Sequence, residues 1–190
     1  MTTIMDTVRA AEQAKYDVAY KLPNYRMGDR RMVDAIKDLR DLPCRGTYLD
    51  VGCGRGEMLI HARELGFTSY KGTEVVADLI DGSTVVEAQG HDLPFPDDAF
   101  DVVSLFDVIE HLPPGDDELV CRELHRVARR HVVLTANNRP SRLPSGEDLH
   151  INIRAYDEWD RMFRRWFDGA LITWLSEQRQ YVSEGWRVDV

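Results

Sequence analysis

The sequence predicts an α/β fold with a mostly parallel β-sheet and helices on both of its faces. Apolar strand-like runs alternate with helical segments from residue 47 onward, a pattern typical of parallel sheets. The first of these runs turns directly into a glycine-rich loop. The last two runs, 171–175 and 181–190, are separated only by a polar turn, so we expect an antiparallel pair of strands at the C-terminal end.

Composition fits one domain. The chain has 190 residues, 43% of them hydrophobic, which is enough for a core and argues against disorder. It contains neither a signal-like apolar segment nor an apolar run long enough to span a membrane. Three cysteines without metal-type spacing suit a reducing compartment, so we expect a cytoplasmic protein and assign no metal ligands.

The N-terminal part predicts two helices. Residues 2–19 form a polar helix with few apolar positions, and residues 20–28 form a turn-rich segment with two tyrosines. Met32, Ile36 and other apolar residues recur at helical spacing over 29–39. We predict a single domain over residues 1–190, with a helical cap or lid over 1–45 and a core over 46–190.

The core is predicted as follows. Pro113, Pro114 and Gly115 break the chain before a helix for which Asp116 is the candidate cap. Gly66 ends an earlier helix and Gly169 a later one. Strands are expected at 47–51, 70–74, 83–88, 100–106 and 131–135, and helices at 57–65, 75–80, 116–130 and 157–167.

The most informative segment is the glycine loop after the first core strand. Gly52, Gly54 and Gly56 follow Asp50 in the order G-x-G-x-G, and the dinucleotide pattern G-x-G-x-x-G fails because Glu57 stands where its last glycine belongs. Glycines let the backbone approach a ligand, and the next helix presents unpaired amide groups. These features predict a ligand site at the carboxyl end of the sheet.

This segment resembles motif I of the class I S-adenosylmethionine-dependent methyltransferases, which have a Rossmann-like fold. The resemblance implies that Asp50 and the loop hold the methionine and sugar portions of S-adenosylmethionine, and that Glu74 at the end of the next strand binds the ribose hydroxyls. A surface acid at a strand end is the competing interpretation of Glu74 alone. The implied loop residues are Gly52, Cys53, Gly54 and Gly56, with Val75 beside Glu74.

Two further stretches resemble the same family, in particular its small-molecule and ubiquinone-biosynthesis-like members. Residues 89–103 resemble a run whose first residues bind adenine, which implies Gln89, Gly90 and His91, although the family usually has Asp where Gln89 stands. Residues 104–113 resemble the segment that forms the floor of the donor site, which implies Phe106 and Asp107. Helix capping and core contacts are the alternative roles for Glu110 and His111.

The resemblance places an acceptor site near His150, between the fifth strand and the last core helix. His150 is the first candidate general base and His111 the second, because histidine exchanges protons near neutral pH. A structural loop histidine is the alternative for His150. Tyr25 in the cap is a further candidate contact to the cofactor. The other cap residues that could reach the site are Tyr16, Tyr20, Arg26, Arg30 and Arg31.

The predicted function is methyl transfer from S-adenosylmethionine to an oxygen or nitrogen nucleophile of a small molecule, leaving S-adenosylhomocysteine. A net charge of −9 disfavours nucleic acid as acceptor. A local arginine cluster keeps a nucleotide or nucleic-acid acceptor open, and a non-catalytic S-adenosylmethionine-binding regulator is the third hypothesis. The cluster consists of Arg139, Arg142, Arg154, Arg161, Arg164 and Arg165.

Overall fold

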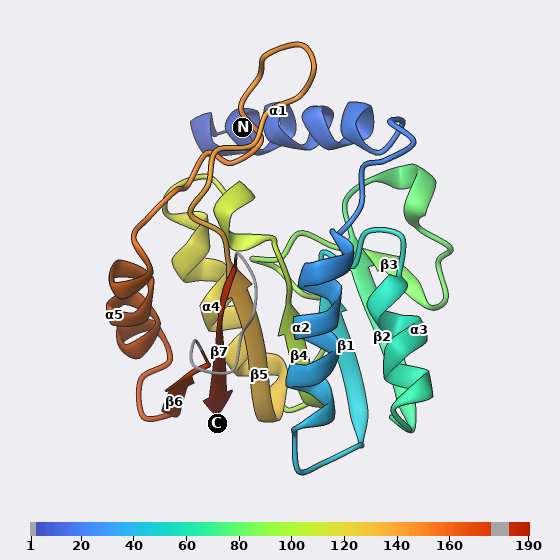
Figure 1. The fold of residues 1–190 in the computed structure, drawn as a ribbon, viewed down its shortest axis with the longest axis vertical. Helices are drawn as coiled ribbons and strands as arrows, with labels where there is room; N and C mark the ends of the chain where they lie inside the picture. Colours follow the sequence, from blue (N-terminus) through green and yellow to red (C-terminus); the bar gives the residue numbers. More distant parts are fainter. Residues whose placement is uncertain (1–2, 176–182) are drawn as a thin grey trace.

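The computed structural model describes residues 3–175 and 183–190. Its described strands form one seven-stranded sheet in the order β3-β2-β1-β4-β5-β7-β6 (Figure 1). Strands β1 to β5 run parallel to one another, and β7 runs antiparallel to β5 and, as predicted, to β6. The strands are β1 (Thr47–Val51), β2 (Ser69–Glu74), β3 (Val85–Glu87), β4 (Phe100–Leu105), β5 (Ala128–Ala136), β6 (Leu171–Trp174) and β7 (Glu184–Asp189).

Helices cover both faces of the sheet, which confirms the predicted α/β fold. One core cluster packs α4 and α5 on the sheet through Leu124, Trp159 and Phe163. The other packs α2 and α3 on the opposite face through Leu39 and Leu59. The helices are α1 (Ile4–Ala19), α2 (Asp29–Arg40), α3 (Glu57–Glu64), α4 (Asp116–Val127) and α5 (Tyr156–Trp166), with 3-10 turns η1 (Ala77–Leu79) and η2 (Ile109–His111).

Several element boundaries differ from the prediction. The helix expected over 116–130 ends at Val127, because Ala128 already pairs with Phe100 and β5 begins there. Gly115, with a φ of 102°, is the residue before this helix, so Asp116 is its first residue and not its cap. The helix expected over 75–80 is only the turn η1, and the strand expected over 83–88 shortens to β3. Residues 181 and 182 of the last predicted strand lie outside the described residues.

Helix α1 lies across the carboxyl ends of the parallel strands (Figure 1). It begins with a capping box, in which the Thr3 side chain accepts the amide of Asp6 and the Asp6 side chain accepts that of Thr3. Ala19 is its only fully buried residue among those described. Ala19 and Tyr16 pack against Leu143 and Leu149, and the space beneath α1 is the site described next.

Candidate functional site

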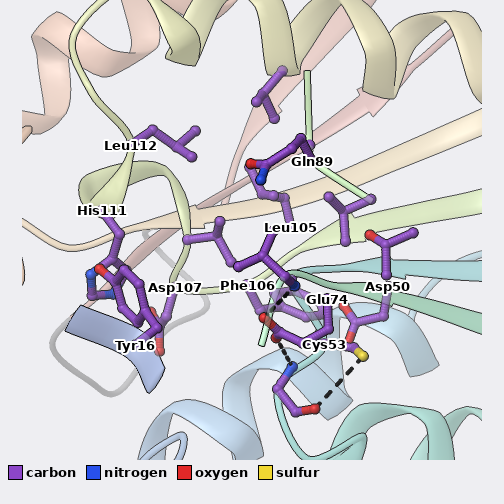
Figure 2. A pocket seen from close by; sticks show the side chains of 18 of the residues that line it. Tyr16, Asp50, Cys53, Glu74, Gln89, Leu105, Phe106, Asp107, His111 and Leu112 are labelled. Atoms are coloured by element: carbon purple, nitrogen blue, oxygen red, sulfur yellow. Dashed lines mark hydrogen bonds between the residues drawn. The ribbon is translucent and has the colours of Figure 1, made fainter. Parts of the chain in front are cut away.

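A cavity of about 230 Å³ lies between α1 and the carboxyl ends of β1, β2 and β4. Figure 2 shows Asp50, Cys53 and Glu74 on one side of it and Tyr16 and His111 on the other. Of the cap residues that could reach the site, Arg30 does not line this cavity. The sequence-predicted cofactor-binding and catalytic residues all line it except Gly56. Those that do are Asp50, Gly52, Cys53, Gly54, Glu74, Val75, Gln89, Gly90, His91, Phe106, Asp107, Tyr25, His111 and His150.

The glycine loop needs its glycines for two reasons. Gly52 and Gly54 have φ angles of 69° and 56°, which side-chain-bearing residues rarely adopt. A Cβ on Gly54 would lie 2.5 Å from the Tyr20 hydroxyl, and one on Gly52 would lie 2.7 Å from Val108. Gly56 also has a positive φ, 77°, but it stands before α3, where it lets the chain enter the helix. Its role is therefore in the turn and not in the cavity wall.

Glu74 is held by backbone amides. Its Oε2 accepts from the amide of Gly54 at 2.9 Å, and its Oε1 accepts from those of Val75 and Val76 at 2.7 and 3.2 Å. The side chain is buried yet lines the cavity. A carboxylate offers about four lone-pair sites, so it retains acceptor capacity toward a bound hydroxyl.

Asp50 is the second buried carboxyl group on the same side of the cavity as Glu74. Its Oδ1 accepts from the Ser104 hydroxyl at 2.5 Å, and the Ser104 Oγ lies 2.6 Å from the Tyr48 hydroxyl. Burial raises the pKa of Asp50 to about 7, although the hydrogen bonds from Ser104 and Tyr48 act against this rise. Asp50 can therefore gain or lose its proton near neutral pH.

Gln89 and Val75 connect the sheet to α1. The side-chain amide of Gln13 donates to the carbonyl of Val75 at 2.7 Å and accepts from Nε2 of Gln89 at 3.3 Å. Gly90 lies close to the apolar side chains of Val51 and Val120, so a Cβ there would crowd the wall of the cavity. This end of the cavity thus combines amide groups with an apolar surface, as a flat heteroaromatic ring requires.

Asp107 follows β4 with a φ of 53°, an uncommon value for a residue other than glycine. Its backbone amide donates to Oγ1 of Thr135 at 2.8 Å, and its carboxylate pairs with Arg31 at 3.0 Å. Backbone strain of this kind is concentrated at functional sites. Asp107 and the buried ring of Phe106 form the floor of the cavity where β4 ends.

The two candidate histidines meet although they are distant in the sequence. Their ring centroids are 4.6 Å apart, and Tyr16 of α1 contacts the His111 ring edge-on with 5.4 Å between centroids. Nδ1 of His111 lies 3.0 Å from the carbonyl oxygen of Leu149, and Nδ1 of His150 lies 2.5 Å from that of Arg139. Because a carbonyl oxygen only accepts, each Nδ1 carries the proton and each Nε2 has a free lone pair.

Burial keeps both rings neutral. It lowers the pKa of His111 to about 3, with help from the neighbouring His150, and it also lowers the pKa of His150. Glu110 lies next to them, fully buried, and neither of its carboxyl oxygens has a hydrogen-bond partner among the described residues. Burial, reinforced by the charge of Asp107, raises the pKa of Glu110 well above its usual range.

Helix α1 contributes more of the site than the sequence prediction named. Arg9 and Gln13, which the prediction did not name, line the cavity beside Tyr16 and Tyr20, which it did. The four residues recur every three or four positions, so they share one face of α1 and of its C-cap, Tyr20. That polar and aromatic stripe was the signal available in the sequence. Tyr25 also lines the cavity, packs edge-on against Tyr20 at 4.9 Å, and has its pKa raised by burial to about 12.

The residues present fit S-adenosylmethionine. The glycine loop leaves a cradle that a Cβ on Gly54 would fill, and Glu74 can accept from a vicinal diol. Asp50 and Asp107 both line the cavity, and a carboxylate attracts a positively charged sulfonium strongly in a buried site.

A family comparison agrees with this geometry. A family model described as a methyltransferase domain matches residues 24–181. The 27-O-demethylrifamycin SV methyltransferase of Amycolatopsis mediterranei (strain S699) is 29% identical over 112 residues, which are 52% of this chain. The match covers only 40% of the length of that curated relative.

Solved structures share the fold. A Burkholderia thailandensis 1,6-didemethyltoxoflavin-N1-methyltransferase, solved with 1,6-didemethyltoxoflavin and S-adenosylhomocysteine, has a TM-score of 0.73 at 15% identity, covering 98% of this chain and 90% of its own. An S-adenosylmethionine-dependent methyltransferase from Mesorhizobium loti has a TM-score of 0.63 at 16% identity, covering 85% of this chain and 99% of its own. Because the family model spans most of the chain, this protein belongs to the methyltransferase domain family of S-adenosylmethionine-dependent enzymes.

Proposed function

We propose that the chain transfers a methyl group to an oxygen or nitrogen atom of a small molecule that binds beside His111 and His150. The observation that carries this proposal is the contact between two imidazoles that line the donor cavity, each bound through Nδ1 to a backbone carbonyl. The other ring nitrogen, Nε2, then accepts the acceptor's proton or a hydrogen bond from it. S-adenosylmethionine, when bound, supplies an electrophilic methyl group on a sulfonium centre.

Different residues of the cavity have different roles in the reaction. Glu74, Asp50 and the glycine loop orient the donor, and the Gln13–Gln89 pair adjoins its adenine end. As the bond from the acceptor atom to carbon forms, the carbon–sulfur bond breaks and its electron pair stays on sulfur. The acceptor's proton passes to Nε2 of His150 and then to solvent. Helix α1 shields this displacement from water.

A small acceptor is favoured over nucleic acid by two observations. The cavity lies beneath α1 and measures only about 230 Å³. Four of the six arginines that indicated an anionic acceptor already pair with carboxylates of the chain. These pairs are Arg142–Asp148, Arg154–Asp117, Arg161–Asp157 and Arg164–Asp160.

The named relatives support the same acceptor class. One is a methyltransferase of a rifamycin derivative and another of a toxoflavin precursor, both small molecules.

We also propose one methyltransferase domain for residues 1–190, with α1 as its lid, and a cytoplasmic location, which suits three unpaired cysteines. No helix among the described residues is long and apolar enough to cross a membrane.

The test uses radiolabelled donor and a fractionated cell extract as the source of acceptors. We expect label in the small-molecule fraction, and we expect His150→Ala to lower its rate by about 10²–10⁴-fold, the usual contribution of a general base. Cofactor affinity should stay unchanged in that variant, and His61→Ala, at a half-buried residue of α3 that does not line the cavity, should behave as wild type. Label confined to the nucleic-acid fraction, or cofactor binding without any transfer, would contradict the proposal.

A further inference from the structure

Glu110, His111 and His150 form a cluster with the composition of a metal site. One ligand atom from each, a carboxylate oxygen or an imidazole nitrogen, lies within 4.8 Å of the other two. Two histidines and one carboxylate form a common ligand set for zinc and for other divalent transition metals. This set could not be predicted from the sequence, because His150 lies far along the chain from the other two residues.

The orientation of the histidines is the one that metal ligands need. Each ring is fixed through Nδ1 to a backbone carbonyl, of Leu149 or Arg139, which leaves Nε2 unprotonated. Ligating histidines in proteins nearly always direct their second nitrogen to such an outer acceptor, which sets the tautomer and the ring orientation.

The loop that carries His150 is fastened to the turn that carries the other two residues. The carbonyl of Glu110 accepts from the amides of Ile151 and Asn152, both at 3.0 Å. The side chain of Asn152 in turn donates to Asp117 of α4 at 2.9 Å. Backbone bonds therefore hold the three side chains together.

Glu110 is the independent sign that a ligand is missing. It is fully buried, and neither carboxyl oxygen makes a hydrogen bond of good geometry among the described residues, although the backbone amides of Glu110 and Asn137 lie near enough to offset part of the rise in its pKa. A buried carboxyl group left in this way costs free energy that a native structure normally avoids. A cation between Glu110 and the two histidines would remove that cost.

We propose that Glu110, His111 and His150 bind one divalent transition-metal ion, zinc being the best match, with an open position toward the cavity. Ligand atoms around one zinc ion lie about 3.3 Å apart, given metal–ligand distances of about 2.0–2.2 Å, so modest side-chain rotations close the present spacing. His111 and His150 line the cavity, so the open position faces the proposed acceptor site.

Such an ion would bind an oxygen atom of the acceptor and ease the loss of its proton to solvent. This second role rests on the proposed function and narrows it to oxygen nucleophiles such as phenols and enols. The histidines would then act as ligands instead of proton acceptors. The metal-binding part of the proposal needs neither the donor nor the acceptor.

The experiment titrates chelator-stripped protein with zinc against a chromophoric chelator, and with cobalt by visible absorption. We expect one ion per chain. Glu110→Gln and His150→Ala should each weaken binding by about 100-fold or more, whereas His61→Ala, at a half-buried residue of α3 that does not line the cavity, should bind as wild type. Glu110→Gln keeps the size of the side chain, and S-adenosylhomocysteine binding by each variant reports that it is folded.

Failure of the wild-type protein to bind either ion, or unchanged affinity in Glu110→Gln, overturns the metal site, and neither result depends on methyl transfer. Acetohydroxamate, a small oxygen ligand, tests the open position. It should shift the spectrum of the cobalt-loaded protein, and an unchanged spectrum overturns the role in binding the acceptor.

Discussion

The amide of Gly54 donates to Oε2 of Glu74 at 2.9 Å, which ties the loop after β1 to the end of β2. The same carboxylate accepts from Val75 and Val76 through its other oxygen. Glu74 therefore shapes the glycine loop as well as facing the cavity. The two sequence features that indicated a cofactor site are thus joined directly in the structure.

Replacing Glu74 tests this joint role. We expect Glu74→Gln to weaken S-adenosylmethionine binding by at least about tenfold, or about 1.4 kcal/mol, because the amide side chain has one acceptor oxygen and no charge. Isothermal titration calorimetry measures the effect. Glu87→Gln is the matched control, since Glu87 is the exposed register neighbour of Glu74 on β3. Equal affinities in the two variants would show that Glu74 does not contact the cofactor.

The raised pKa of Asp50 predicts pH-dependent cofactor binding. Because this pKa is about 7, Asp50 ionises as the pH rises from about 6 to about 8, and its negative charge then attracts the sulfonium. We expect the affinity for S-adenosylmethionine to increase over this range. S-adenosylhomocysteine lacks the positive sulfur and should show a smaller increase, and Asp50→Asn should remove it. A rise of equal size for both ligands would exclude this mechanism.

The raised pKa of Asp50 also makes the free energy of unfolding depend on pH. The ordinary pKa of an aspartate is 3.8, so between about pH 4 and pH 7 the folded chain holds this proton while the unfolded chain releases it. The contribution of Asp50 to the free energy of unfolding therefore falls as the pH rises through this window. Urea unfolding should show a shallower fall in Asp50→Asn than in wild type.

The sequence predicted the parts of this protein that depend on local chemistry. A strand, a glycine loop and a helix follow each other between residues 47 and 64, so the position of Asp50 and of the loop could be read from their order. Glu74 followed from the same logic at the next strand. The end of α4 could not be predicted, because the pairing of Ala128 with Phe100 is a contact between distant segments.

Contacts between distant segments also determine the part of the cavity around His111 and His150, so that part could not be predicted from the sequence either. Nothing in the sequence shows that Glu110 is enclosed without a partner or that His111 and His150 touch, since loop 137–155 must first fold back onto η2. Amphipathic spacing likewise does not distinguish a helix that covers a site from one that packs on a sheet. Helix α2, expected in the cap, buries Ala35 and Leu39 in the core beside β1.

Gly54 provides a test of how closely α1 covers the loop. Gly54→Ala should lower the free energy of unfolding by about 1–3 kcal/mol, because φ is 56° and the new Cβ would meet the Tyr20 hydroxyl at 2.5 Å. Tyr20→Ala in the same chain should restore part of this loss, which chemical denaturation in a double-mutant cycle measures. Gly66→Ala is the control for backbone strain alone, since its φ is 88° and no atom lies within 4 Å of its Cβ. If Gly54→Ala and Gly66→Ala lowered the free energy of unfolding equally, and Tyr20→Ala restored none of it, Tyr20 would not contact the glycine loop.

One ion pair ties α1 to α4. Arg9 of α1 makes two hydrogen bonds of 2.7 Å to the buried carboxylate of Asp116 at the start of α4. Since Ala19 is the only fully buried residue of α1, we expect Arg9→Gln to free the helix while the sheet stays intact. Hydrogen exchange of residues 4–19 should accelerate by about tenfold or more, with strand protection unchanged. Arg122→Gln, which breaks an exposed pair with Glu118 on α4, should leave α1 as it is in wild type. Unchanged exchange of α1 in Arg9→Gln would mean that Gln13 and Tyr16 hold the lid without the ion pair.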